Sequence, residues 1–267
     1  MIPKLIHYCW FGCNSIPDDN ASYIAGWKKQ HPDYEFRFWN EANFDVNTAK
    51  FTAQVSETKK WGFIVDYMRA WCVFKFGGIF LDTDVEIIKP LDDLLENNIC
   101  FAGFESNKFV NPGSIFAGEK GCHIAQELMD FYAEYSFIKA DGELSLTASP
   151  VIFTEILQKY GLKQNNTYQK FGVFTAYPQD YFSPKDFITG KINITANTYS
   201  IHHYAMSWFS DLEIFLINRR RKITGSFGNN IITRTVLFIL NFSTRCIRIG
   251  IKNTLSYYIN RYIKGNP

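Results

Sequence analysis

Two aspartates, Asp82 and Asp84, follow a short apolar run, Ile79-Phe80-Leu81, which itself follows Gly77-Gly78. The glycines end a helix-like segment, and the run has the pattern of a buried strand bounded by turn signals. Along an extended backbone the side chains at i and i+2 point the same way, so both carboxylates can face one cation. Carboxylate oxygens suit Mg²⁺ or Mn²⁺, which share their other positions with water and phosphate oxygens. The alternative is a surface turn with two solvated acids, because Asp-x-Asp alone is common.

A second pair of charges lies in the helical segment before these glycines. Asp66 and Arg69 are three residues apart, and therefore on one face of an otherwise apolar helix. One interpretation is a structural ion pair. In the other, Asp66 accepts from a ribose hydroxyl while Arg69 meets a phosphate or orients the acid.

His202-His203, followed by Ser207-Trp208, is the other concentration of polar chemistry. A neutral imidazole can complete a metal shell begun by the two aspartates, although a His pair after a strand is more often hydrogen-bonded structure. Tyr8 and Trp10 alternate along the first predicted strand. Such aromatics are usually core, but at a strand end they can offer a flat face to a base.

The elements that must position these residues alternate between strand and helix. Strands are predicted at 4–11, 34–39, 79–81, 99–104, 171–176 and 199–203, and helices at 21–30, 56–76, 90–96, 123–135 and 151–160. This alternation predicts an α/β fold with a mostly parallel sheet covered by helices. Ligands of such sheets bind beyond the carboxyl ends of strands, where Asp82 and Asp84 fall.

Composition indicates a folded chain in a reducing compartment. The 267 residues are 46% apolar and 17% aromatic, which allows a sizeable core and argues against disorder. The six cysteines include no Cys-x-x-Cys pair, which argues against a disulfide framework or a zinc site and favours the cytoplasm. The N-terminus lacks the basic, apolar and small-residue series of a signal peptide.

The net charge of +2 conceals an asymmetry that predicts two regions. Residues 1–210 hold 18 Lys+Arg against 24 Asp+Glu, hence −6, whereas residues 211–267 hold 10 against 2, hence +8. The second region contains Arg219-Arg220-Arg221-Lys222 and then isoleucines interleaved with basic residues, the pattern of a basic amphipathic helix. We expect it to lie on an anionic membrane surface, the alternative being helices that pack on the body. Nucleic acid fits less well, because the acidic body offers no basic groove.

Taken together, these motifs resemble a known family. Residues 2–12 (Ile-Pro-Lys-Leu-Ile-His-Tyr-Cys-Trp-Phe-Gly), Trp39-Asn40-Glu41, Asp66-Tyr67-Met68-Arg69 and residues 77–84 occur in order, followed by the His202-His203 and Ser207-Trp208 pairs. Over about residues 1–210 they are similar to the bacterial capsular-polysaccharide glycosyltransferases of family 32, which carry a sugar-binding region with an Asp-x-Asp motif. The large clostridial glucosylating toxins are more distantly similar.

The resemblance implies a GT-A fold, a nucleotide-sugar donor, a divalent cation and retention of anomeric configuration. The resemblance also implies a role for each site residue. Trp10 would stack on the base, Asp66 would hold the ribose, and Arg69 would lie beside the donor sugar or phosphates. Asp82 would touch ribose or sugar hydroxyls and the metal, Asp84 would be the firmest metal ligand, His202 rather than His203 would be the third protein ligand, and Ser207 and Trp208 would close over the diphosphate. Ser149-Pro150 departs from the Gly-Pro often found in relatives.

No residue identifies itself as a nucleophile. Glu105, just after the strand 99–104, is the nearest carboxylate by position, and Asn111 is a neutral alternative. The resemblance favours front-face transfer assisted by the leaving diphosphate. The expected function is transfer of a hexose from a UDP-sugar, such as UDP-galactose, UDP-glucose or an N-acetyl form, to a lipid-linked or growing polysaccharide or lipopolysaccharide. A catalytically silent nucleotide-sugar-binding scaffold and a nucleotide-sugar phosphohydrolase are the alternatives.

Overall fold

The computed structural model of the 267-residue chain describes residues 1–105, 108–205 and 211–227, and residues 231, 233, 235–240, 242, 243, 246, 251, 254 and 255. The chain divides into two compact units, residues 1–187 with 191–208 and residues 188–190 with 209–267. All strands found among the described residues belong to the first unit, so this unit builds the site.

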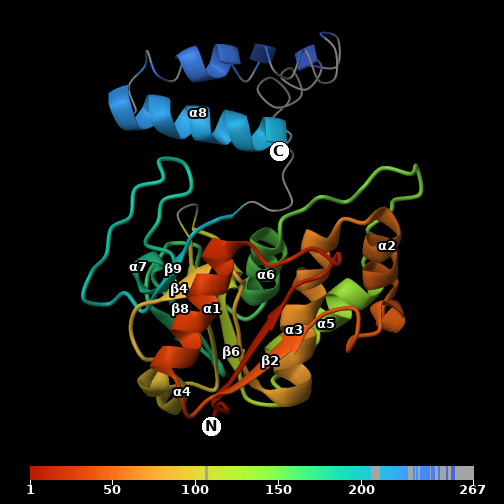
Figure 1. Ribbon diagram of the computed structural model, residues 1–267, viewed down its shortest axis with the longest axis vertical. Helices are drawn as coiled ribbons and strands as arrows, with labels where there is room; N and C mark the ends of the chain where they lie inside the picture. The colour runs from red at the N-terminus through yellow and green to blue at the C-terminus, as the bar shows by residue number, and fades with distance from the viewer. Residues whose placement is uncertain are drawn as a thin grey trace. The chain divides into compact units, whose positions relative to one another are not determined.

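A seven-stranded mixed sheet forms the centre of the first unit (Figure 1). In spatial order its strands are β2 (Glu35–Trp39), β1 (Leu5–Cys9), β3 (Gly78–Phe80), β6 (Val110–Gly118), β5 (Cys100–Phe104), β8 (Phe174–Tyr177) and β7 (Gln169–Phe171). Strands β6 and β7 run against the direction that the other five share. The predicted α/β class with a mostly parallel sheet is confirmed.

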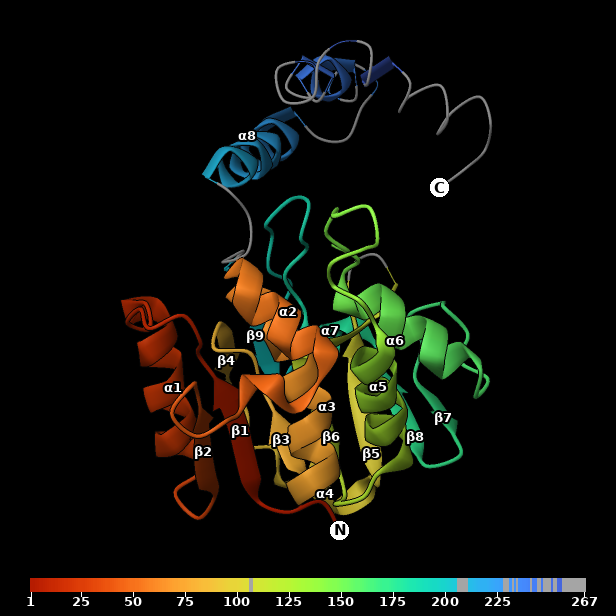
Figure 2. The ribbon, with the colours of Figure 1, turned by 90° about the vertical axis from the view of Figure 1, so that its right-hand side faces the viewer.

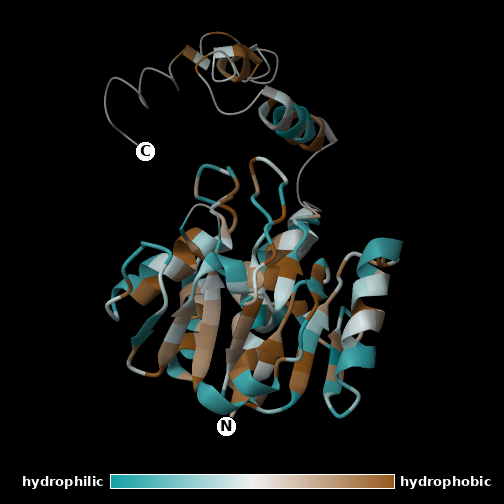
Figure 3. Ribbon diagram, turned by 90° about the vertical axis from the view of Figure 1, so that its left-hand side faces the viewer, coloured by the Kyte–Doolittle hydropathy of each residue, from teal (hydrophilic) through white to brown (hydrophobic). Residues whose placement is uncertain are grey.

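Two apolar cores cover the two faces of this sheet. On one face pack α2 (Lys50–Thr58), α3 (Ile64–Phe76), α5 (His123–Glu134) and α6 (Ser149–Gln158), and Figure 2 shows α3 and α5 in front of the strands. The other face carries α1 (Asp18–Gln30), α4 (Asp92–Asn97), α7 (Gln179–Phe182) and a two-stranded sheet of β4 (Val85–Ile87) and β9 (Ser200–His202). In Figure 3 the strands are largely apolar and α1 is largely hydrophilic.

The helix before the two aspartates ends where the glycines predict. Helix α3 stops at Phe76, and the Gly77 amide donates to the Val73 carbonyl at 2.9 Å. Gly77 and Gly78 have φ angles of 69° and 99°, in the left-handed region that favours glycine. A Cβ atom on Gly78 would lie 2.4 Å from the Leu5 carbonyl oxygen. The two glycines therefore let β3 start directly beside β1.

Several predicted elements were wrong in detail. The predicted helix 56–76 is two helices, because Lys59 adopts a left-handed φ of 55° that ends α2, and residues 61–63 form a separate 3₁₀ turn before α3. The predicted strand 171–176 is a hairpin of β7 and β8. Strand β6, with nine residues, was not predicted, because its Asn111-Pro112-Gly113-Ser114 segment has the composition of a turn.

In the second unit the structure describes helix α8, Asp211–Phe227, and shorter helical pieces as far as residue 255. Helix α8 carries the basic cluster Arg219-Arg220-Arg221-Lys222. Among the helices in the described part of the chain, none combines the length and the apolar character needed to cross a membrane.

His7 joins three parts of the first unit without carrying a charge. Its side chain is fully buried, its Nδ1 accepts from the Trp39 indole N–H at 3.1 Å, and its Nε2 lies 3.0 Å from the Gly77 carbonyl oxygen. The neutral imidazole, accepting at Nδ1 and donating from Nε2, satisfies both nitrogens. Burial lowers the pKa of His7 to about 4.

We expect the free energy of unfolding to fall as the pH drops from 6.5 towards 4, because unfolded His7 takes up a proton before folded His7 does. The free energy of unfolding should fall by at most roughly 3 kcal/mol over this pH range. Urea unfolding of the wild-type chain and of His7→Gln between neutral pH and pH 4 measures this contribution. The stability difference between the two proteins should shrink as the pH falls, and a difference that stays constant would contradict the prediction.

Candidate active site

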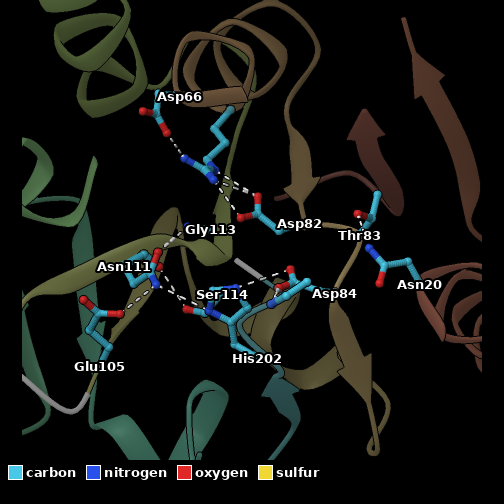
Figure 4. Close-up of polar contacts among 12 residues, drawn as sticks. Asn20, Asp66, Asp82, Thr83, Asp84, Glu105, Asn111, Gly113, Ser114 and His202 are labelled. Carbon is cyan, nitrogen blue, oxygen red and sulfur yellow. Dashed lines mark hydrogen bonds and ion pairs between the residues drawn. The ribbon is translucent and has the colours of Figure 1, made fainter. Parts of the chain in front are cut away.

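Asp82 and Asp84 lie in a tight turn between β3 and β4. The Val85 amide donates to the Asp82 carbonyl at 3.1 Å and closes the turn, so the expected extended backbone through the two aspartates is wrong. Because β3 belongs to the seven-stranded sheet and β4 to the two-stranded sheet, this turn is where the chain crosses from one to the other. Oxygens of both carboxylates and a nitrogen of His202 lie within 4.8 Å of one another (Figure 4).

Arg69 links Asp82 to Asp66. Its Nε donates to Asp82 Oδ1 at 3.0 Å, its Nη2 donates to Asp82 Oδ2 at 2.7 Å, and its Nη1 donates to Asp66. Burial raises the pKa of the Asp66 carboxyl to about 6 against the opposing effect of Arg69. Burial acts to lower the pKa of Arg69, but the two carboxylates hold it above its ordinary value. The ion pair considered from the sequence is thus present, and the nucleotide-binding role of Asp66 stays a prediction.

Asp84 is held by the chain around β9. Its Oδ1 lies 3.4 Å from His202 Nε2, and its Oδ2 accepts from the Ala205 amide at 2.6 Å. Burial alone would raise the pKa of Asp84, but His202 and the Ala205 amide lower it to about 2. Burial acts to lower the pKa of His202, but Asp84 holds it above its ordinary value. Asp84 is therefore ionised at neutral pH, the state that a metal ligand requires.

Strand β6 and the end of β5 close the next side of the site. The Nδ2 of Asn111 donates to Glu105 Oε2 at 2.9 Å and lies 3.4 Å from His202 Nδ1, while its Oδ1 accepts from the Gly113 amide at 2.7 Å. The Gly113 carbonyl accepts from the Asp82 amide at 3.2 Å. Asn111 is therefore connected both to His202 and, through Gly113, to Asp82.

Sequence reasoning missed three residues of this site. Gly113 belongs to a segment that reads as a turn, and the tight packing around it is visible only in three dimensions. Ala205 contributes only its backbone amide, which leaves no signal in the residue type. Asn20, whose Nδ2 donates to Thr83 Oγ1 at 2.9 Å, lies far from Thr83 in the sequence.

Three other predicted residues lie at the edges of this cluster or outside it. The Nε2 of His203 lies 2.9 Å from Glu86 Oε2, and the ring stacks on Tyr23, so His203 faces away from the two aspartates. Tyr8 is 7% exposed and packs in the core, whereas Trp10 is half-buried just beyond the end of β1.

Two further predicted residues, Ser207 and Trp208, lie outside the described residues.

The donor set fits a hard divalent cation. Two carboxylates and one imidazole converge, and the 3.4 Å between Asp84 Oδ1 and His202 Nε2 is near the separation of adjacent ligands in an octahedral shell. That separation is roughly 3 Å for bonds of about 2.1 Å. Asp82 Oδ1 accepts from both Nε and Nη2 of Arg69, whereas Oδ2 accepts from Nη2 alone, so Oδ2 keeps a second lone pair for a metal.

The segment that contains the two aspartates resembles a known protein family. Residues 17–100 match the family model described as "Glycosyltransferase sugar-binding region containing DXD motif", in which Asp82-Thr83-Asp84 supplies the motif. This segment, about a third of the chain, is thus similar to the sugar-binding region of the DXD glycosyltransferases, which confirms the predicted resemblance over residues 17–100. The bacterial and capsular parts of that prediction stay predictions. The matched segment includes Asp66 and Arg69, while Trp10 and His202 lie outside it.

Among curated proteins, the chain is similar to inositol phosphoceramide mannosyltransferase 3 of Schizosaccharomyces pombe, 30% identical over 35% of this chain and 27% of that protein. It is also similar to the uncharacterized glycosyltransferase L373 of Acanthamoeba polyphaga mimivirus, 26% identical over 62% of this chain and 68% of that protein. The chain thus spans about a quarter of the first relative.

Among solved structures, a glycosyltransferase involved in glycosylation of the major capsid of PBCV-1 aligns with a TM-score of 0.46 and 11% identity, over 79% of this chain and 98% of that one.

Gly113→Ala should destabilise the site, because a Cβ atom there would lie 2.5 Å from Asp82 Oδ2 and 3.0 Å from Arg69 Nη2. Displacing a buried ion pair by overpacking costs about 1–3 kcal/mol. Gly26→Ala is the matched control, since nothing lies within 4 Å of its added Cβ and alanine favours helix α1 by about 0.5–1 kcal/mol. Thermal unfolding should show opposite shifts for the two variants, and equal shifts would contradict the steric argument.

Proposed function

We propose that this chain is a metal-dependent glycosyltransferase that moves a hexose from a nucleotide sugar to a saccharide or lipid-linked acceptor. The observation that carries the proposal is the convergence of Asp82 and Asp84, from the turn that carries the Asp-x-Asp motif, with His202 at the end of β9. A divalent cation bound there would act as a Lewis acid for the negative charge that develops on the departing diphosphate.

The residues around the cation site have distinct roles in this proposal. Asp84 is the firmest ligand, because its carboxylate is ionised and its Oδ1 faces His202. Asp82 supplies a second carboxylate whose direction Arg69 fixes, and Arg69 itself lies beside the donor sugar or phosphates. Trp10, at the end of β1, offers an indole face to the base. Ser207 and Trp208 are proposed to close over the diphosphate on the evidence of the family motif alone.

Transfer with retention of configuration is proposed to proceed on one face of the sugar, without a carboxylate nucleophile. Glu105 is the carboxylate nearest to that role, but it is 8% exposed and accepts from the Asn111 amide. A nucleophile must approach the anomeric carbon directly. The contacts of Glu105 fit better with holding Asn111 in place.

The donor and acceptor are the finer parts of the proposal. A UDP-hexose is the first choice from the family resemblance, and the two mannosyltransferases among the relatives add mannose donors to the sugars to be tested. A lipid-linked or growing polysaccharide is proposed as acceptor. The basic cluster of α8 would then attach the chain to an anionic membrane surface, on the inner face of a cytoplasmic membrane.

A nucleotide-sugar-binding scaffold without catalysis and a nucleotide-sugar phosphohydrolase are the rival functions. Product release by the purified chain separates these rivals from the transferase. Release of nucleoside diphosphate is measured with a panel of UDP- and GDP-sugars, first in Mn²⁺ and then in chelator. Mn²⁺-dependent release that accelerates with a sugar acceptor supports the transferase. Release of nucleoside monophosphate and sugar 1-phosphate, independent of the acceptor, supports the phosphohydrolase. Donor binding without release, even when acceptors are supplied, supports the scaffold.

Asp84→Asn should reduce metal-dependent turnover by at least about a thousandfold, because the amide removes a charged ligand from the cation. The turn should survive, since the asparagine side chain keeps an oxygen that can accept from the Ala205 amide. Turnover is measured at saturating Mn²⁺ and folding by circular dichroism. Full metal-dependent activity in a folded Asp84→Asn protein would contradict the assignment of this residue.

Glu105→Gln distinguishes a nucleophile from a residue that holds Asn111. We expect the variant to keep more than about a tenth of wild-type turnover, because the glutamine oxygen can still accept from Asn111 Nδ2. A loss as large as that of Asp84→Asn, or a trapped glycosyl-enzyme detected by mass spectrometry in the wild type, would instead establish Glu105 as the nucleophile.

A further inference from the structure

Helix α1 binds the edge of β4 that does not pair with β9. Three of its side chains donate to alternate residues along this part of the chain: Asn20 Nδ2 to Thr83 Oγ1 at 2.9 Å, Trp27 Nε1 to the Val85 carbonyl at 2.8 Å, and Gln30 Nε2 to the Ile87 carbonyl at 2.7 Å. Strand β9 pairs with the opposite edge. Alternate residues of a strand direct their carbonyls to the same edge, so the helix occupies the place of a third strand.

We propose that Asn20 is a positioning residue of the metal site, which acts through Thr83 on the turn that carries both aspartates. The proposal rests on the proposed metal-dependent function. Thr83 lies between the two aspartates in that turn, and Figure 4 shows it beside Asn20.

Burial makes the contact between Asn20 and Thr83 effective. The two residues are 5% and 7% exposed, so water does not compete freely for the amide and the hydroxyl. A buried hydrogen bond between two side chains restricts the conformations of both side chains. Its loss leaves buried polar groups unpaired, which favours conformations in which they bond to other partners. Without the Asn20 amide, the Thr83 hydroxyl would draw the turn toward a different partner and change the direction of the adjacent carboxylates.

The two carboxylates on either side of Thr83 are held by separate contacts. Asp82 is directed by Arg69, and Asp84 by His202 and the Ala205 amide, so each carboxylate is held by a different element. These contacts fix each carboxylate, while the Asp82 amide donates to the Gly113 carbonyl and the His203 amide to the Asp84 carbonyl, which holds the backbone on either side of Thr83. The hydrogen bond from Asn20 is the side-chain contact that the structure gives to the middle of the turn. Partners of metal ligands that act in this indirect way typically change metal affinity by 10–100-fold.

Gln30 supplies a matched control within the same helix. Its amide donates to a β4 backbone carbonyl as Asn20 donates to Thr83, but its partner Ile87 lies at the end of the strand away from the aspartates. Gln30→Ala therefore removes a hydrogen bond between the same two elements without touching the turn. Thr83→Val and Thr83→Ser test the other partner, since valine removes the hydroxyl and serine keeps it.

The experiment is titration of the full chain with Mn²⁺ alone, followed by electron paramagnetic resonance, with melting curves for every variant. We expect Asn20→Ala and Thr83→Val each to weaken Mn²⁺ binding by about tenfold or more, and the double variant by no more than either single one. Gln30→Ala and Thr83→Ser should bind within about threefold of the wild type.

Unchanged Mn²⁺ affinity in folded Asn20→Ala and Thr83→Val would overturn the proposal. An equal loss of Mn²⁺ affinity in Asn20→Ala and Gln30→Ala would also overturn it, because the effect would then be general destabilisation. If Asn20→Ala does not fold, Thr83→Val against Thr83→Ser decides the question. Failure of the proposed function gives a different result: the wild type and Asp84→Asn would then bind Mn²⁺ equally, and the positioning role would fall with the metal site.

Discussion

The buried guanidinium of Arg69 is the interaction on which the site depends. It lies between the carboxylates of Asp66 and Asp82, which would otherwise repel each other in a poorly solvated place. Removing one partner from such a group typically costs about 3–5 kcal/mol, because a buried charge is left uncompensated. Arg69 and Asp66 are on helix α3 and Asp82 follows β3, so this group also fixes the helix against the strand that leads to the site.

The geometry that brings Arg69 to Asp82 is set by the reversal between α3 and β3. From Arg69 to Phe76 the helix rises about 10 Å, at 1.5 Å per residue. From Gly78 to Asp82 an extended chain covers about 13 Å in the opposite direction. The side chains of Arg69 and Asp82 can therefore meet only because the chain reverses direction within Gly77 and Gly78. The positive φ angles of these two residues exclude most other residue types. The glycines thereby determine the alignment of the charged group.

Much of this arrangement could be predicted from the sequence because it is local. The end of α3 at Gly77, the short strand after it and the carboxylates beyond the strand follow from residue types within about twenty positions. The turn between Asp82 and Val85, the course of β6 and the left-handed Lys59 could not be predicted, since each depends on packing that overrides local preference. His202 was predicted from the family motif, whereas its link to Glu105 through Asn111 required the fold.

The candidate site is a junction between two sheets, and this explains why its proposed metal ligands come from distant parts of the chain. Asp82 follows β3 of the seven-stranded sheet, whereas Asp84 precedes β4 and His202 ends β9 in the two-stranded sheet. A cation held by all three would join the sheets at this turn, in addition to the apolar core that the two sheets share. Its affinity therefore depends on how rigidly each sheet presents its carboxylate, because any relative movement separates ligands that must stay about 3 Å apart. In the proposed function, Arg69 and helix α1 would therefore affect metal affinity without contacting the metal.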